Sequence, residues 1–458
     1  MTKRFWIACA ACCGLLAQTN GRTLFSQRLP SYTGPYGVGT VDLEVPTQPV
    51  ALSNMTYAVS GKPAFELKTV LVSLFYPARA QRGMSQPKHY WIPRPLALTA
   101  QGYAKCAKSS NRVIDALFTA ILWLLARNIE IPARVDIPLL DPIEDQSWPV
   151  LIFSHGDASS RTSYSQFCGE MASRGYVVAA VEHRDGSCAA SIVSERDGSK
   201  ERILCTNEAD LRSDGHLVGS DAFKQAQLVF RRAEVSATVD VVKRLYYGQG
   251  NSIYHQNARN EGRVLQAFSG KLMPNDFTMA GHSFGATLTL QILKGGSSDT
   301  LPFSGALVFD PGKDSGPLNS DIDVPVLIVH SQRWSQKHST FYGRPHFDVV
   351  KSIAEGVLKR GIKAWFMTSL GTSHTSVTDA PLLEPLLLNW ITGSSIDAHK
   401  GLELYVDVSS AFLKFQHLGT ESDLLSRAID APEFQNPKNK KSGLYKAWEI
   451  HVAPAQKH

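Results

Sequence analysis

The 458-residue sequence lacks the residue spacings that usually hold a metal ion. It contains no HExxH pair for zinc, no paired CxxC motifs and no EF-hand loop for calcium. We therefore expect chemistry that needs no metal and no other cofactor. Metal-dependent hydrolases are set aside as a class on this ground.

A strong charge imbalance and long apolar runs are also missing. The 47 basic and 41 acidic residues give a net charge of only +6. Part of this excess lies near the C-terminus, but no nucleic-acid motif or interleaved aromatic residues accompany it, so we predict no nucleic-acid partner. Residues 5–17 and 113–126 are apolar, yet both stretches are too short to cross about 30 Å of hydrocarbon as helices. We predict no transmembrane span.

The first residues have the pattern of a secretory signal peptide. Lys3 and Arg4 precede the apolar run of residues 5–17, which is followed by polar residues. We assign residues 1–20 to this signal and expect a secreted protein. An intracellular, membrane-associated protein is the alternative.

Cysteine is scarce, with seven residues in the whole chain. Three of them lie in the predicted signal peptide and would be removed with it. The other four can form up to two disulfides in an oxidising compartment or remain buried thiols, and the sequence does not choose between these outcomes. These four are Cys106, Cys168, Cys188 and Cys205.

Short β-branched runs alternate with longer helical patterns along most of the chain. This alternation predicts an α/β fold with a mostly parallel central sheet and helices on both faces. The predicted strands are residues 70–76, 150–154, 176–182, 277–281, 306–310, 324–330 and 364–370. The predicted helices are residues 164–173, 220–247, 285–294, 346–359 and 381–390.

The length and composition favour a single elaborated domain. Two stretches, residues 187–215 and 249–274, are expected to be surface insertions in the form of loops or lid elements. Beyond Pro432 the chain is basic and has no clear pattern, so we expect a loose tail over residues 432–458.

The strongest chemical motif is Gly281-His282-Ser283-Phe284-Gly285, a GxSxG pattern between a predicted strand and a predicted helix. A serine on such a sharp turn has its hydroxyl exposed at the edge of the sheet, and the flanking glycines leave room for the turn. The motif identifies Ser283 as the nucleophile of an α/β-hydrolase.

A serine nucleophile needs an imidazole to take its proton and a carboxylate to orient that imidazole. In this fold the acid follows the serine and the histidine comes last. Asp310 ends a predicted strand and His374 follows another, so we predict these two as acid and base. Rival residues in the same region are Asp314, Asp321 and Asp323 for the acid, and His330 and His346 for the base.

The tetrahedral intermediate carries an oxyanion that backbone amides can stabilise. One donor is predicted to be the amide of Phe284, directly after the nucleophile. The second is predicted to be the amide of Asp157, which follows the strand 150–154. The carboxylate of Asp157 would oppose the developing charge unless its side chain points away.

Together these motifs resemble the secreted and intracellular type II platelet-activating factor acetylhydrolases, also called group VII phospholipases A2. The likeness spans residues 34–420, which we take as the catalytic domain, and is dense in residues 153–156 (FSHG) and 179–185 (AAVEHRD). It implies an α/β-hydrolase fold, with the family's Ser, Asp and His at Ser283, Asp310 and His374. It also implies calcium-independent hydrolysis of short or oxidised sn-2 acyl chains. The sequence departs from the family pattern at Asp157, Ala158 and Ala286.

An apolar helix is predicted over residues 113–126. It is either a core helix, a lid over the site or a face that contacts a lipid surface. In the resembled family a helix in this region docks on lipid particles. The residues of the possible lipid-surface helix are Leu117, Phe118, Ile121, Leu122, Trp123, Leu124 and Leu125.

The hypothesis from the sequence is a serine esterase that acts on the sn-2 ester of phospholipids such as platelet-activating factor. A phospholipid is the expected substrate, with peripheral contact to a lipid surface as a further expectation. A generic carboxylesterase, lipase or polyester hydrolase on the same fold is the alternative, because a triad identifies ester chemistry and not the leaving group. A non-catalytic lipid-binding protein is the third hypothesis.

Overall fold

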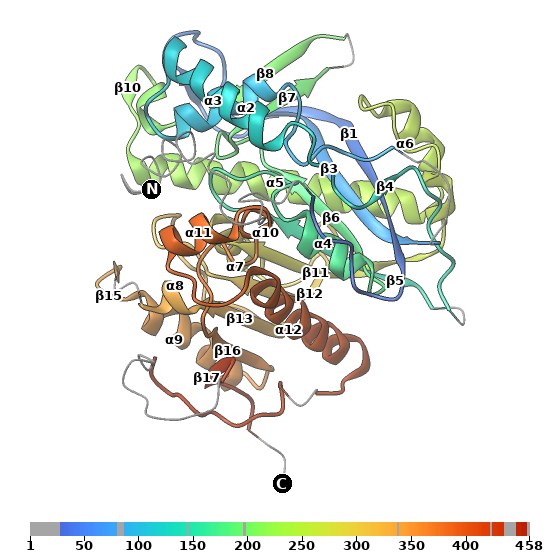
Figure 1. Cartoon of the computed structure of the whole chain (residues 1–458), viewed down its shortest axis with the longest axis vertical. Coiled ribbons are helices and arrows are strands. Elements are labelled where there is room, and N and C mark those ends of the chain that lie inside the picture. The colour runs from blue at the N-terminus through green and yellow to red at the C-terminus, as the bar shows by residue number, and fades with distance from the viewer. Residues whose placement is uncertain are drawn as a thin grey trace, which may run out of the picture. The chain divides into compact units, whose positions relative to one another are not determined.

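The computed structural model describes residues 28–79, 87–143, 146–195, 198–336, 339–421, 424–434 and 446–455. The predicted signal peptide, residues 1–20, lies outside these ranges. The chain divides into two compact units, Gln27–Phe277 and Thr278–His458. Figure 1 shows the helices and strands of both.

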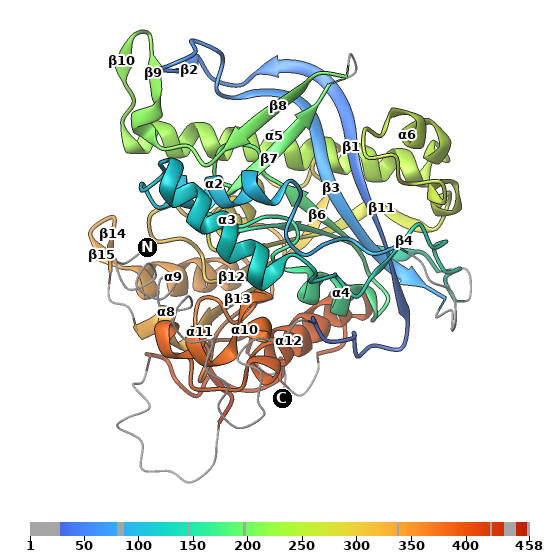
Figure 2. The same cartoon turned by 45° about the horizontal axis from the view of Figure 1, so that its top comes forward.

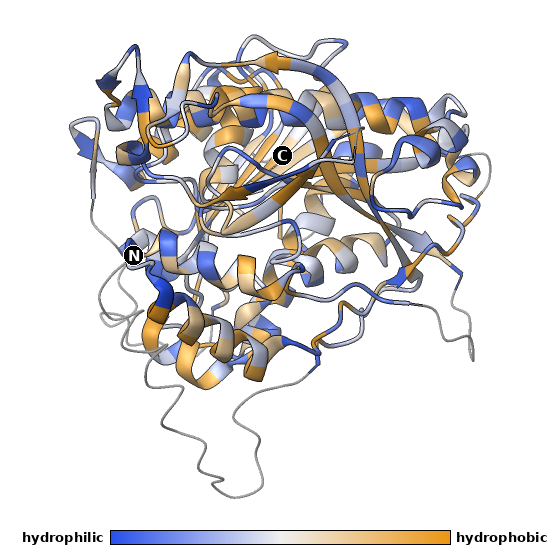
Figure 3. Ribbon diagram, turned by 90° about the horizontal axis from the view of Figure 1, so that it is seen from above, coloured by the Kyte–Doolittle hydropathy of each residue, from blue (hydrophilic) through white to orange (hydrophobic). Residues whose placement is uncertain are grey.

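The sheet strands of the first unit lie in the order β5-β6-β3-β1-β4. β5 pairs with β6 in parallel, as does β1 with β4, whereas β3 is antiparallel to both of its neighbours. The strands are β1 (Gly37–Ala51), β3 (Glu66–Ala78), β4 (Arg134–Val135), β5 (Trp148–Ser154) and β6 (Val177–Glu182). The helices are α2 (Leu96–Cys106), α3 (Arg112–Ala126), α4 (Ser165–Ala172), α5 (Ser220–Tyr246) and α6 (Gly250–Gln256). Along the helices in Figure 3 polar and apolar colours alternate, as expected where one face packs on a core.

The long strand β1 was not predicted because its buried positions include acids. Asp42 and Glu44 are buried in β1 and form ion pairs with Arg161 and Arg184, respectively. A buried carboxylate needs such a partner, since its desolvation would otherwise cost several kcal/mol. The polar residues of β1 therefore make its sequence resemble that of a solvent-exposed segment.

The two predicted insertions are more ordered than expected. Residues 187–215 contain the antiparallel hairpin of β7 (Ala190–Ser194) and β8 (Lys200–Leu204), the turn η1 (Glu208–Asp210) and β9 (Leu211–Ser213). β9 lies between β2 (Met55–Tyr57) and β10 (His216–Leu217) in a small sheet. Residues 249–274 contain α6, η2 (Leu265–Phe268) and the start of β11. These stretches are structured parts of the first unit, and the expectation of loops was wrong for most of their length.

One disulfide joins Cys106, at the end of α2, to Cys205, directly after β8. Cys168 and Cys188 are buried and lie outside this disulfide. The four cysteines thus divide between the two outcomes that the sequence left open.

The second unit has a mainly parallel arrangement of strands in the order β11-β12-β13-β16-β17. β12, β13 and β16 are parallel, and β17 is antiparallel to β16. The strands are β11 (Leu272–His282, which begins in the first unit), β12 (Phe303–Phe309), β13 (Val326–Ser331), β16 (Ala364–Ser369) and β17 (Trp448–Val452). The helices are α7 (Phe284–Ile292), α8 (Gln332–Gln336), α9 (His346–Lys359), α10 (Ala380–Leu383), α11 (Pro385–Thr392) and α12 (Ala398–Leu418). A two-stranded hairpin, β14 (Thr340–Phe341) and β15 (Arg344–Pro345), precedes α9.

The predicted loose tail contains the strand β17. Its five residues are buried and pair with β16, so this part of residues 432–458 belongs to the core of the second unit. Within the described ranges, the structure has no helix that is both long and apolar enough to span a membrane.

Candidate active site

Ser283 lies at the turn between β11 and α7, where the sequence predicted a nucleophile. Its backbone is strained, with φ 57° and ψ −117°, and its amide donates to the carbonyl of Phe309 at 3.0 Å. The turn requires glycine at residue 281, because a Cβ there would lie 2.2 Å from the carbonyl oxygen of Gly285. The side chain of Ser283 is half-buried. This is the local geometry of a nucleophile elbow.

Asp310 follows β12 directly and is almost fully buried. One carboxylate oxygen accepts a hydrogen bond from the Ser331 amide at 2.6 Å, and the other accepts from the Ser331 hydroxyl at 2.7 Å. The second oxygen also accepts from Nδ1 of His374 at 3.0 Å. Burial opposes ionisation of Asp310, but His374, His282 and these hydrogen bonds hold the pKa of its carboxyl below the ordinary value.

His374 follows β16 on a loop and keeps 31% of its side chain exposed. A carboxylate only accepts hydrogen bonds, so the contact with Asp310 places a proton on Nδ1 and leaves Nε2 as the basic nitrogen. One face of the imidazole stacks on Trp334, with ring centroids 3.9 Å apart and an interplanar angle of 11°. The ring of His282 lies 4.4 Å from that of His374. The imidazole is therefore held by a carboxylate and two rings, one of which belongs to the residue before Ser283.

The rival acids and bases have other surroundings. Asp314 and Asp323 are exposed, and Asp321 is exposed in an ion pair with Arg360. His330 is buried and hydrogen-bonds Ser335 through Nδ1. His346 is also buried, stacks on His330, and has its pKa lowered by burial to about 4. Asp310 and His374 are the acid and base positions that the structure brings together.

The two predicted oxyanion donors belong to different units. Phe284 is the first residue of α7, so its amide is at the positive end of that helix. Asp157 follows β5 in the first unit with its side chain exposed, and the next amide, that of Ala158, donates to the carbonyl of Ser187 at 2.7 Å. The role of the Asp157 amide stays a prediction.

Among the described residues, the ligand atoms of His282, Asp310 and His374 approach one another within 4.8 Å, which is close enough to hold a metal ion. Both carboxylate oxygens of Asp310 already accept hydrogen bonds in this arrangement. Hydrogen bonds within the protein therefore explain why these three side chains lie close together.

Two aromatic neighbours of His374 were not predicted from the sequence. His282 occupies the variable position before the nucleophile, where the motif gives no information. Trp334 lies in the five-residue helix α8, three residues after β13 ends. Its position in the sequence, shortly after a predicted parallel strand, could have indicated a site residue. Asp310 and His374 also follow parallel strands and lie at the carboxyl edge of the sheet.

The predicted apolar helix is α3, and most of its side chains are not buried. Only Ala126 is fully buried among its 15 residues. Val113, Leu117, Trp123 and Leu124 are exposed, with Val113 at 76% and Leu124 at 57%. Asn111 caps the helix by accepting from the amides of Val113 and Ile114. α3 packs beside α2, as Figure 2 shows, and presents a largely apolar surface.

Comparisons with known proteins show the family of this chain. The family model described as "Platelet-activating factor acetylhydrolase, isoform II" matches residues 23–431. A putative phospholipase A2 of Schizosaccharomyces pombe is 27% identical over 86% of this chain and 93% of its own length. The platelet-activating factor acetylhydrolase of Gallus gallus is 48% identical over 61% of this chain and 64% of its own length.

Among solved structures, a ferulic acid esterase from Streptomyces cinnamoneus matches 88% of this chain and 97% of its own length. The TM-score is 0.54 at 18% sequence identity, so this likeness concerns the fold alone. Together with the mainly parallel strands and flanking helices, it confirms the predicted α/β-hydrolase fold.

Proposed function

Because the chain belongs to the platelet-activating factor acetylhydrolase family and is therefore an ester hydrolase, we propose that it hydrolyses the sn-2 acyl ester of glycerophospholipids. The acyl group is short, either acetyl or an oxidised fragment, as in platelet-activating factor. The observation that carries this proposal is the hydrogen-bonded pair of Asp310 and His374 in the same unit as the strained elbow at Ser283.

In the proposed mechanism the hydroxyl of Ser283 attacks the sn-2 carbonyl carbon while Nε2 of His374 takes its proton. Asp310 holds the imidazole in the required tautomer and stabilises the imidazolium that forms. The amides of Phe284 and Asp157 are the proposed oxyanion donors, and loss of one such donor costs about 3–4 kcal/mol of transition-state stabilisation. The lyso-lipid leaves with the proton from His374. Water, activated by the same imidazole, then releases the acyl group from Ser283.

We also propose that α3 contacts the lipid surface from which the substrate is drawn. The exposed apolar side chains of the helix support this proposal over burial in a core. Trp123→Asp combined with Leu124→Asp should weaken binding to liposomes in a folded protein. Unchanged liposome binding would rule out this contact.

Secretion is proposed on two grounds. Residues 1–20 have the pattern of a signal peptide, and the disulfide between Cys106 and Cys205 fits an oxidising compartment. The test is to express the full chain in a eukaryotic host and to look for it in the medium, with N-terminal sequencing of the recovered protein.

Turnover of phosphatidylcholines that differ only in sn-2 acyl length tests the substrate proposal. We expect fast release of acetyl and short oxidised chains, a steep fall for long chains, and no change when EGTA removes calcium. Faster hydrolysis of long-chain triglycerides or polyester films would favour the generic esterase or lipase instead. A folded protein that a fluorophosphonate does not label at Ser283 would favour a non-catalytic lipid-binding protein.

A further inference from the structure

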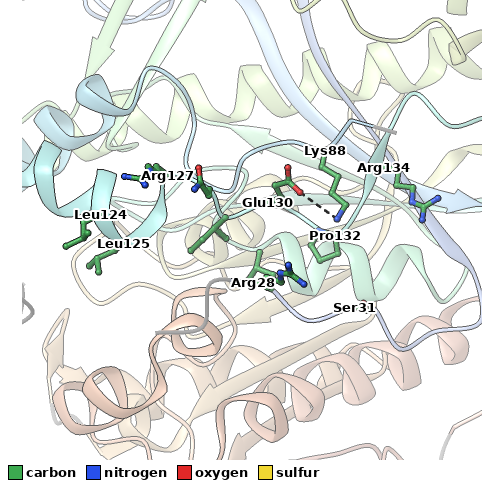
Figure 4. A pocket seen from close by; sticks show the side chains of 12 residues that line it. Arg28, Ser31, Lys88, Leu124, Leu125, Arg127, Glu130, Pro132 and Arg134 are labelled. Atoms are coloured by element: carbon green, nitrogen blue, oxygen red, sulfur yellow. Dashed lines mark ion pairs between the residues drawn. The ribbon is translucent and has the colours of Figure 1, made fainter. Parts of the chain in front are cut away.

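A cavity of about 840 Å³ opens in the first unit next to the C-terminal end of α3. Figure 4 shows that side chains of different character surround it. Leu124 and Leu125 of α3 line one part. The remaining lining is mostly basic and polar, and its charged members are Arg28, Lys88, Arg127, Glu130 and Arg134.

The cavity has a marked excess of positive charge, because four of these five side chains are cations. Lys88 and Glu130 lie 3.8 Å apart, but both are substantially exposed, so this ion pair is weak. The guanidinium of Arg127 lies 3.5 Å from the ring of the exposed Trp123. The basic lining therefore continues into the apolar surface of α3.

Backbone hydrogen bonds fix the segments that carry two of the basic residues, Lys88 and Arg134. The segments around Lys88 and Glu130 run side by side, with Trp91 donating to Ile129 and Ile131 donating to His89, both at 2.9 Å. Arg134 belongs to β4, which pairs with β1. Lys88 and Arg134 thus project from structured backbone, which lowers the entropy cost of binding an anion.

We propose that this cavity binds the headgroup of an anionic phospholipid in a bilayer. The cations would contact the phosphate and its negatively charged substituent, while Leu124 and Leu125 would contact the acyl region. An amphiphile fits this lining better than a free anion, because basic and apolar side chains share one cavity. The proposal rests on the proposed lipid contact of α3 but not on the ester chemistry.

The test uses the full chain carrying Ser283→Ala, so that lipid turnover cannot change the vesicles. Binding is measured by co-sedimentation with vesicles of phosphatidylcholine alone or of phosphatidylcholine mixed with phosphatidylserine. We expect phosphatidylserine to strengthen binding. Adding Lys88→Gln and Arg134→Gln should weaken binding to the mixed vesicles about tenfold or more and leave binding to phosphatidylcholine unchanged.

The matched control replaces two exposed cations of the second unit, Lys294→Gln and Lys359→Gln. An equal loss in this control would overturn the proposal in favour of non-specific attraction. It would also be overturned if phosphatidylserine did not strengthen binding, or if inorganic phosphate at millimolar concentration displaced the protein from the vesicles. In the active background, both pairs of substitutions should leave hydrolysis of a soluble short-chain ester unchanged. This readout separates a failure of the headgroup site from a failure of the proposed esterase.

Discussion

In the unit of residues 27–277 buried carboxylates pair mainly with arginines, whereas in the unit of residues 278–458 the buried Asp310 pairs with the partly exposed imidazole of His374. The first unit contains the buried ion pairs Arg161 with Asp42 and Glu182, Arg184 with Glu44, and Arg231 with Asp185. Burial lowers the pKa of imidazoles in both units, to about 4 for His155 in the first and to about 3 for His282 in the second.

This difference separates two uses of buried polar groups. An arginine paired with a carboxylate cannot release its proton near neutral pH, so the arginine pairs of the first unit can only support structure. In the second unit the buried carboxylate of Asp310 is paired with His374, whose imidazole is partly exposed. A pair of this kind can transfer a proton.

Ser283→Ala should abolish esterase activity, with a fall in kcat of about a millionfold, because it removes the proposed nucleophile. Asp310→Asn should lower kcat about ten-thousandfold, because an amide stabilises the wrong tautomer of His374. Steady-state kinetics on a short sn-2 phospholipid and circular dichroism check both variants. Activity retained by folded Ser283→Ala would disprove the assignment.

Arg161→Met should destabilise the protein by about 3–5 kcal/mol, because it leaves Asp42 and Glu182 buried without their cation. Burial opposes ionisation of Asp42, yet Arg161 and His89 keep its pKa below the ordinary value. The control is Arg360→Met in the exposed pair with Asp321, which should cost less than about 1 kcal/mol. Urea unfolding at pH 7 measures both, and equal losses would contradict the contrast between the units.

Acid should destabilise the protein through its buried histidines. The pKa values of His282, His346 and His451 are lower in the folded state than the value of about 6.5 in an unfolded chain. The unfolded chain therefore binds more protons between these values, and the stability present above pH 6.5 is lost as the pH falls toward 4. Each group contributes a slope of up to about 1.4 kcal/mol per pH unit.

The measurement is the free energy of urea unfolding between pH 7 and pH 4.5. His346→Leu, which removes one titrating group, should reduce the slope. An unchanged slope in this variant would show that the loss of stability has another source.

Trp334→Ala should lower kcat roughly tenfold with little change in KM, because the imidazole of His374 loses the ring that fixes its plane. Trp334→Phe keeps an aromatic face and should restore most of the activity. Trp390→Ala, at an exposed tryptophan of α11, is the control and should have no effect. A KM increase with kcat unchanged would indicate that Trp334 contacts substrate and does not position His374.

Much of the second unit could be predicted because its parallel strands are buried on both faces and appear as continuous apolar runs. The predicted helix 346–359 coincides with α9, and the strand at 364–370 is β16 to within one residue. Asp310 and His374 could be selected because both follow such strands. β17 was missed because it is only five residues long and lies beside a basic tail. α12 was missed because its amphipathic pattern gave a weaker signal than a continuous apolar run.

The first unit was harder to predict because of its buried ion pairs. Acidic residues and arginines are usually found at the surface, but here they are buried. The sequence of β1 therefore did not show the polar and apolar alternation of a half-buried strand. The partners lie far apart in the chain, as with Arg161 and Asp42, and no local pattern reveals them. Trp334 was missed for a similar reason, because its contact with His374 joins α8 to the loop after β16, and these segments meet only in the folded unit.

Because of the disulfide between Cys106 and Cys205, the stability of the first unit depends on redox conditions. It bridges 99 residues, and in the chain-entropy model a loop of this size contributes roughly 4–5 kcal/mol. The bond anchors α2, which packs against α3. A glutathione-rich cytosol would remove this restraint from the helix pair, so the same amino-acid sequence would present a less firmly supported apolar surface inside a cell than outside it.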